Sequence, residues 1–240
     1  MRCFLLGFVL IAAFALWPRT YIYAAESPLP LVHIHLLTDE MPSADGTESA
    51  VTKRLRQRLQ PFPQLKYQIH YVSWPKALAE VAERPDALVY KIARTPARET
   101  KYQWLFADET TQLFLYALSS EPLRRHSLDQ LRSINALRIA CPAQSAHCEM
   151  LRHRGFRDSQ ILEVRLTEQS SVERLLLAKR VRFIAVAEAD LRRRMALLGV
   201  APTAYGKGPL VAELEDYLAG GPLLHPGVRQ LLSAPVSQSL

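Results

Sequence analysis

Short apolar runs alternate with amphipathic segments along most of this chain, and this alternation limits its fold more than any other feature. The strand-like runs of the first part are 31–36, 67–72 and 86–90. Between them, Val51, Leu55 and Leu59 lie at helical spacing, and Pro75 suits the first turn of a second helix. Strands that alternate with helices in this way form parallel sheets. The first part therefore predicts one β-α-β-α-β unit.

The rest of the chain repeats this rhythm. Strands are predicted over 112–118, 137–141, 161–166 and 183–186, and helices over 128–132, 145–153 and 189–198. Gly199 ends the last of these helices. Residues 202–222 are rich in Gly and Pro and are expected to carry the chain back toward the first unit. The pattern thus predicts an α/β protein with mostly parallel sheets flanked by helices.

The first 25 residues have the composition of a leader. Arg2 precedes an apolar run of fourteen residues, Cys3–Leu16. A membrane-spanning helix needs about 20 residues, so the run fits the core of a signal peptide better. We expect residues 1–25 to be a signal peptide, cleaved near Ala24 or Ala25, that directs the protein to the periplasm. A short uncleaved N-terminal anchor is the alternative.

The charge balance bears on the choice of partner. The formal net charge is +7, and it stays near +5 without Arg2 and Arg19 of the leader. Apart from Arg192–Arg194 the remaining arginines are scattered, and no aromatic platform accompanies them, so we expect no nucleic-acid partner. The positive balance favours anionic solutes or an anionic membrane surface.

No cofactor or metal is expected. The chain has nine Gly and no Gly-rich phosphate loop, and Ser145 lacks the flanking glycines of a nucleophile elbow. His33 and His35 share a face of a predicted strand but have no partnered third ligand, so packing or surface roles explain them better than a metal site.

Cys141 and Cys148 remain once Cys3 is assigned to the leader. In an exported protein such a pair suggests a disulfide, and the six residues between them are enough to close a strand–loop–helix corner. Two reduced cysteines, one of them buried, are the alternative, and the sequence leaves both open.

The stretch 86–104 holds the strongest candidates for ligand chemistry. A buried strand ends at Tyr90, and Pro96 forces a turn because it cannot continue a strand ladder. Thr95 and Arg98 therefore follow the carboxyl end of a strand, where small ligands bind in open α/β sheets. An arginine there suits a carboxylate, since its planar fork donates two parallel hydrogen bonds. The alternative is a surface Arg98 paired with Glu99 or with another acid nearby.

This stretch also resembles the Thr-Pro-Glu-Arg segment of periplasmic solute-binding proteins of the polar-amino-acid type, the receptors of ABC importers. Further segments resemble the same family in the same order: Ser73–Glu80, Gln112–Leu118, Ala178–Val186, and Asp216–Ala219 followed by His225–Leu232. The resemblance implies a two-lobed fold with two hinge crossings that closes on its ligand. Lobe 1 would comprise residues 26–117 plus 207–240, and lobe 2 residues 118–206. We also expect a monomer.

Four candidates for the ligand site lie in lobe 1. The resemblance implies that Arg98 pairs with a ligand carboxylate and that Thr95 adds a hydroxyl. Trp74 would form an aromatic wall, with ordinary core packing as the alternative. Tyr90, at the end of the strand, is the fourth candidate.

Three more candidates lie in lobe 2. Gln144 and Ser145 would grip the ligand through free backbone N–H groups at a helix start, although the family usually has Gly there. The family usually places an Asp for the ligand ammonium where this chain has Ala187, and Glu188 would take over that role. A carboxylate-bearing, amino-acid-like ligand is therefore expected, but not necessarily a standard α-amino acid.

The leading hypothesis is a non-enzymatic periplasmic receptor that delivers its solute to an ABC permease or a membrane sensor. The second is an orphan scaffold or sensory module that kept the fold without transporting a solute. The third is a small periplasmic dehydratase-type enzyme with Glu188 or Glu40 as general acid or base. No paired acid and base supports the third hypothesis, and fold alone does not assign function.

Overall fold

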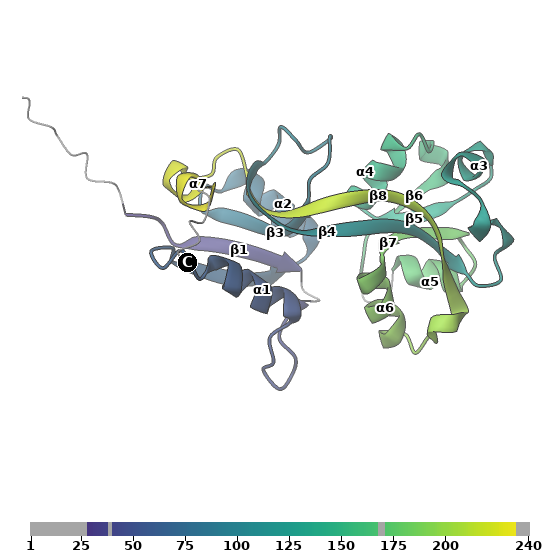
Figure 1. The fold of residues 1–240 in the computed structure, drawn as a ribbon, viewed down its shortest axis with the longest axis horizontal. Helices are drawn as coiled ribbons and strands as arrows, with labels where there is room; N and C mark the ends of the chain where they lie inside the picture. Colours follow the sequence, from purple (N-terminus) through teal and green to yellow (C-terminus); the bar gives the residue numbers. More distant parts are fainter. Residues whose placement is uncertain (1–27, 38–39, 168–170, 234–240) are drawn as a thin grey trace, which may run out of the picture.

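The computed structural model describes residues 28–37, 40–167 and 171–233. The predicted signal peptide, residues 1–25, lies outside them. The described strands form one eight-stranded sheet in the order β2-β1-β3-β8-β4-β7-β5-β6. Its two central strands, β4 (Gln103–Leu118) and β8 (Tyr205–Gly220), are antiparallel, sixteen residues long each, and run from one part of the molecule into the other. Figure 1 shows that they join two halves.

The first half contains three parallel strands, β1 (Val32–Leu37), β2 (Tyr67–Val72) and β3 (Ala87–Ala93). Its helices are α1 (Ala50–Leu59), α2 (Trp74–Glu83) and α7 (Pro226–Ser233). Ser49 caps α1 by accepting a hydrogen bond from the backbone N–H of Thr52, and Pro75 lies in the first turn of α2. The β-α-β-α-β unit predicted from the sequence is therefore confirmed.

The second half is built in the same way. Its parallel strands are β5 (Ile139–Pro142), β6 (Ile161–Val164) and β7 (Phe183–Ala187). Its helices are α3 (Leu128–Ser133), α4 (Ala146–His153), α5 (Val172–Leu177) and α6 (Glu188–Leu197). Short 3₁₀ turns at Pro122–Arg125, Asp158–Gln160 and Pro202–Ala204 connect these elements.

Both faces of the sheet are packed in each half. In the first half, Leu55 of α1 packs with Ile34 and Leu88 of the sheet in the layer shared with α7. On the other face, Val81 of α2 packs with Val89 and Ile92. In the second half, Leu131, Ile139 and Leu151 lie in one layer and Val172, Ile184 and Leu191 in the other. Each such side chain contributes about 1.5–3 kcal/mol on full burial, so each half has its own apolar support.

The two long strands are where the sequence prediction was incomplete. The strand expected over 112–118 begins at Gln103, because the polar residues Asp108 and Glu109 interrupt its apolar pattern without ending its pairing with β8. The Gly- and Pro-rich return segment is mostly strand β8. The pairing of β4 with β8 shifts register at four places, one of them between Ala107 and Thr110. We call the region where the two halves meet, which these two strands cross, the junction (Figure 1).

Within the described ranges, none of the helices combines the length and the apolar composition that crossing a membrane requires.

Candidate functional site

The first half brings Trp74, Thr95 and Arg98 to the junction. Trp74 is the first residue of α2. After β3, the chain turns so that the backbone N–H of Arg98 bonds to the carbonyl oxygen of Thr95 at 3.0 Å. Thr95 is 1% exposed and Arg98 is 4% exposed. Because of this burial, Arg98 is not the surface arginine of the alternative interpretation. Its guanidinium lies 5.7 Å from the centre of the Trp74 ring.

The second half brings the start of α4 to the same place. Gln144 has φ 59°, a left-handed conformation usually taken by Gly, and lets the chain turn from β5 into α4. Cys141 and Cys148 form a disulfide that ties the end of β5 to the first turns of α4. Glu149 also lies in this first part of the helix. The sharp turn and the disulfide together hold the Glu149 carboxylate toward the first half.

Glu149 meets Thr95 and Arg98 across the junction. Arg98 Nε donates to Glu149 Oε1 at 2.9 Å, and Thr95 Oγ1 donates to Glu149 Oε2 at 2.6 Å. The remaining guanidinium nitrogens donate to backbone oxygens, Nη2 to Gln144 at 3.1 Å and Nη1 to Ala93 at 3.3 Å. Each oxygen of one carboxylate thus receives its own donor. We call Trp74, Thr95, Arg98, Gln144 and Glu149 the carboxylate site.

Gln144 and Ser145 act differently from the sequence expectation. The carbonyl oxygen of Gln144 faces the first half, where it accepts from Trp74 Nε1 at 3.0 Å as well as from Arg98. Its N–H points to Glu163 at 3.4 Å. Ser145 precedes α4 as its N-cap without a side-chain capping bond, and its N–H bonds to the carbonyl of Pro142. The loop therefore offers Arg98 an acceptor, whereas N–H donors were expected.

Tyr90 lies on the other face of the sheet. It is 2% exposed and packs with the core under α1. Burial raises the pKa of the Tyr90 hydroxyl far above its usual value, and the neighbouring Asp108 adds to this shift. The structure does not bring Tyr90 together with Arg98. Trp74, which Arg98 faces, packs with Val89 and Ile92 on the α2 side of the sheet.

Glu188 begins α6 and forms ion pairs with Lys207 and Arg192. The hydrogen bond from Lys207 lowers the pKa of the Glu188 carboxyl below its usual range. Its charge is thus balanced by Lys207 and Arg192, and its described partners do not include the residues of the carboxylate site. Of the seven sequence candidates, the structure brings together Trp74, Thr95, Arg98 and Gln144, with Ser145 adjacent.

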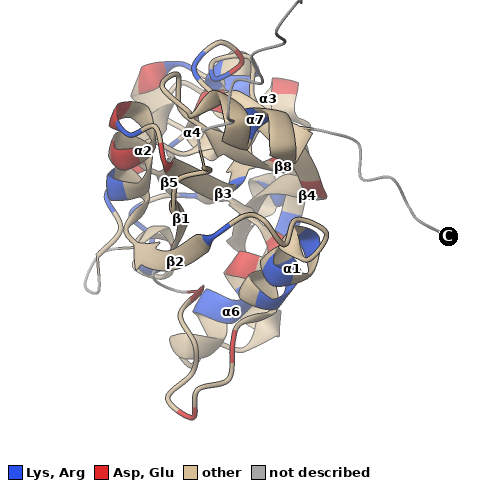
Figure 2. Cartoon of the chain, turned by 90° about the vertical axis from the view of Figure 1, so that its left-hand side faces the viewer, with Lys and Arg blue, Asp and Glu red and all other residues tan. Residues whose placement is uncertain are grey.

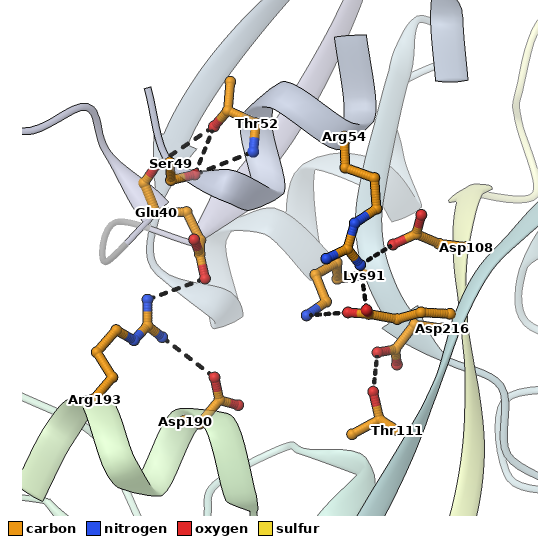
Figure 3. Close-up of polar contacts among 11 residues, drawn as sticks. Glu40, Ser49, Thr52, Arg54, Lys91, Asp108, Thr111, Asp190, Arg193 and Asp216 are labelled. Atoms are coloured by element: carbon orange, nitrogen blue, oxygen red, sulfur yellow. Dashed lines mark hydrogen bonds and ion pairs between the residues drawn. The ribbon is translucent and has the colours of Figure 1, made fainter. Parts of the chain in front are cut away.

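A second ion pair links the halves on the α1 side of the sheet. Arg193 on α6 bonds to Glu40 Oε1 at 3.1 Å and to Asp190 Oδ1 at 3.3 Å (Figure 3). Glu40 belongs to the first half, and its backbone oxygen lies 3.5 Å from the Thr52 hydroxyl of α1. Figure 2 looks onto the first half and shows α1 above α6 on this side. The halves are therefore bridged on both sides of the sheet.

Between the bridges, charged side chains gather on the long strands (Figure 3). Lys91 Nζ lies 2.8 Å from Glu109, which also pairs with Arg54 of α1. Asp216 is 5% exposed and accepts a hydrogen bond from Thr111 Oγ1 at 2.7 Å. Burial raises the pKa of Asp216 to about 6. Lys91 has φ 60° at the bulge in β3, and this backbone turn brings its ammonium into the charged group.

Glu149, Glu40 and Arg193 were missed as interlobe contacts by sequence reasoning. A signal existed for Glu149, since an acidic residue in the first turns of the helix after Gln144 lies next to the expected anion site. Nothing in the local pattern identified Glu40 and Arg193 as partners, because 153 positions separate them.

Comparison with known proteins gives the fold an independent test. No protein-family model and no curated sequence matches the chain. Solved structures do. A histidine kinase sensor domain with similarity to periplasmic binding proteins matches with a TM-score of 0.70 and 13% identity, over 86% of this chain and 88% of that one.

Two further structures are named for amino acids or their transport. An L-cystine ABC transporter protein from Listeria monocytogenes matches with a TM-score of 0.67 and 12% identity, over 85% of this chain and 87% of that one. The holo form of ArgBP from T. maritima matches with a TM-score of 0.65 and 8% identity, over 85% and 87%. The chain therefore has the periplasmic-binding-protein fold, which confirms the resemblance seen in the sequence at the level of the fold.

Proposed function

We propose that this protein binds a small carboxylate-bearing solute between two lobes, with the solute carboxylate held by Thr95 and Arg98 and its body against Trp74. One observation carries the proposal: two buried side chains, Thr95 and Arg98, donate to the two oxygens of a single carboxylate at the junction. A buried arginine of this kind is costly unless it is paired, and it suits a planar anion.

The lobes of this proposal are residues 26–117 plus 207–240 and residues 118–206, with β4 and β8 as the hinge. The binding role is non-enzymatic, in keeping with neighbours whose names describe binding proteins, a transporter and a sensor. The leader-like residues 1–25 support a periplasmic location. The protein delivers its bound solute to a membrane transporter or sensor.

A second candidate function has a specific observation in its favour. All three guanidinium nitrogens of Arg98 already donate to groups of this chain. A sensory module that stays closed without a solute would show the same arrangement, and one structural neighbour is a kinase sensor domain. We keep this function as the alternative.

The test is a thermal-shift screen of the protein from residue 26 onward against amino acids, dicarboxylates, keto acids and short peptides. A ligand at a hundred times its Kd adds about 2.7 kcal/mol, which for a chain of this size raises Tm by about 5–10 °C. Arg98→Lys keeps the charge but loses the fork, so it should abolish the shift. A shift that survives Arg98→Lys would exclude the proposed site, and no shift with any compound would favour the sensory module.

A further inference from the structure

Glu149 has the geometry of a bound ligand carboxylate, although it belongs to the chain itself. Its two oxygens are met by Arg98 Nε and Thr95 Oγ1 at 2.9 and 2.6 Å, and its side chain stays 25% exposed. We propose that Glu149 is an internal competitor for the carboxylate site: it latches the lobes closed without a solute and decides which solutes enter. The admission of solutes rests on the proposed function, whereas the latch does not.

The latch follows from where the contacts lie. Trp74, Thr95 and Arg98 belong to the first half, while Gln144 and Glu149 belong to the second, and four hydrogen bonds join the two sets. The bonds from Arg98 and Thr95 to Glu149 are charge-assisted and short. Two of the four depend on the Glu149 carboxylate, so its removal should shift the lobes toward an open arrangement.

Glu149 controls the entry of solutes because, of the groups that accept hydrogen bonds from Arg98, it is the one that can move away. Gln144 and Ala93 contact Arg98 through backbone oxygens that are fixed by a turn and by a strand. Glu149 contacts Arg98 through a flexible and partly exposed side chain, which can leave by rotamer changes. A solute carboxylate therefore gains access to Thr95 and Arg98 by displacing Glu149.

Competition by a tethered group also narrows the class of solute. A group on the same chain acts at an effective concentration of the order of millimolar or higher. A simple carboxylate that makes no other contact cannot compete with Glu149 in the natural chain at lower concentrations. A solute that displaces it needs a carboxylate and at least one further group that contacts a lobe.

Glu149→Ala removes a CH₂ group and a carboxylate, which together have the size of acetate. The experiment therefore asks whether added acetate replaces the missing group. The natural protein, Glu149→Ala and Glu149→Gln are compared by small-angle X-ray scattering and by thermal shift. Acetate is the probe, acetamide is its neutral isostere, and sodium chloride matches the ionic strength. Asp158→Asn is the matched control, since Asp158 pairs with Arg152 of α4, the helix that carries Glu149, without crossing the junction.

We expect Glu149→Ala to have a larger radius of gyration than the natural protein, while Asp158→Asn does not. Acetate, but not acetamide, should raise the Tm of Glu149→Ala in a saturable way and restore the smaller radius. The natural protein should not respond, and Arg98→Lys combined with Glu149→Ala should lose the response. For any solute found by the screen, Glu149→Gln should bind about tenfold tighter or more, because a latched fraction lowers the apparent affinity.

An unchanged radius in both Glu149 variants, or an equal response of the natural protein and Glu149→Ala to acetate, would overturn the proposal. If Glu149→Ala does not fold, the radius and solute affinity of Glu149→Gln decide the question. A latch that responds to acetate in a protein that binds no solute would support this inference and reject the proposed function. Solute binding that depends on Arg98 but is unaffected by Glu149→Gln would support the proposed function and reject this inference.

Discussion

Arg98 and Glu149 meet across the junction of the two lobes, with Arg98 Nε donating to Glu149 Oε1 at 2.9 Å from a guanidinium side chain that is only 5% exposed. The two residues are 51 positions apart and lie in different halves of the molecule, Arg98 in the turn after β3 and Glu149 in α4. The pair is thus an internal contact between the two halves, and in the latch that we propose stability and lobe closure depend on the same bond.

The first prediction concerns the loss of Arg98. Arg98→Ala should lower the free energy of unfolding by about 3 kcal/mol, the lower end of the range for breaking a buried pair, because Glu149 retains 25% exposure. Urea unfolding followed by circular dichroism measures the difference. Arg94→Ala is the control, since Arg94 pairs with the exposed Glu99 within one half, and it should cost less than about 1 kcal/mol. Equal losses for the two variants would contradict a special role for Arg98.

The second prediction concerns Asp216 and pH. Burial raises its pKa from the usual 3.8 to about 6 in the folded protein, so the folded state binds more protons than the unfolded state between these values. Stability due to this group is therefore lost as pH rises from about 4 to 6. A shift of roughly two units corresponds to about 3 kcal/mol at most.

Asp216→Asn keeps an acceptor for the Thr111 hydroxyl and removes the titration. This variant should be more stable than the natural protein at pH 7, and the gain should shrink toward pH 4. Urea midpoints at pH 4, 5, 6 and 7 check it. A gain that stays constant over this range would contradict the assignment of the raised pKa to Asp216.

The third prediction concerns His35, and its sign is the opposite. Burial holds the pKa of His35 below its usual 6.5. The charge of Glu80 opposes this shift, and the smaller effects of His70, Arg84 and His33 add to it. The unfolded state then binds more protons, so stability is complete above pH 6.5 and is lost as pH falls through the folded pKa. His35→Asn should flatten the stability profile below pH 6.5, as measured by urea midpoints. An unchanged profile would assign the titration to another group.

The fourth prediction concerns the Cys141–Cys148 disulfide. The bond closes a short loop with a sequence separation of 7, for which chain entropy predicts about 2.5 kcal/mol of stabilisation. Replacing both cysteines by Ala should cost about that much and should weaken the contact of Glu149 with Arg98, because Cys148 directly precedes Glu149. Urea unfolding and scattering measure the two effects. The natural protein in reducing agent is the matched control and should behave like the double variant.

The local pattern predicted most elements of the fold. Alternating runs located β1 and β2, and a short, fully apolar run located β3. The spacing of Val51, Leu55 and Leu59 located α1, because burial of one helix face imposes this period on the sequence. It did not predict β8 as one long strand, since Gly and Pro are read as breaking signals although Gly206, Gly208 and Pro209 lie within it. It also ended strand β3 too early, at Tyr90, before the bulge where Lys91 turns into the junction.

By itself, the sequence determined that this chain is an α/β protein and that Trp74, Thr95 and Arg98 lie at the carboxyl edge of its first unit, because both follow from local periodicity and from turns at proline. Only the tertiary structure decided that Tyr90 faces the opposite side, that Gln144 presents a carbonyl oxygen, that Cys141 bonds to Cys148, and that Glu149 reaches Arg98. The physical reason is that a partner across the junction depends on the register of β4 against β8 and on the backbone turn before α4. Those relations join residues distant in the chain, and no short-range pattern of side chains specifies them.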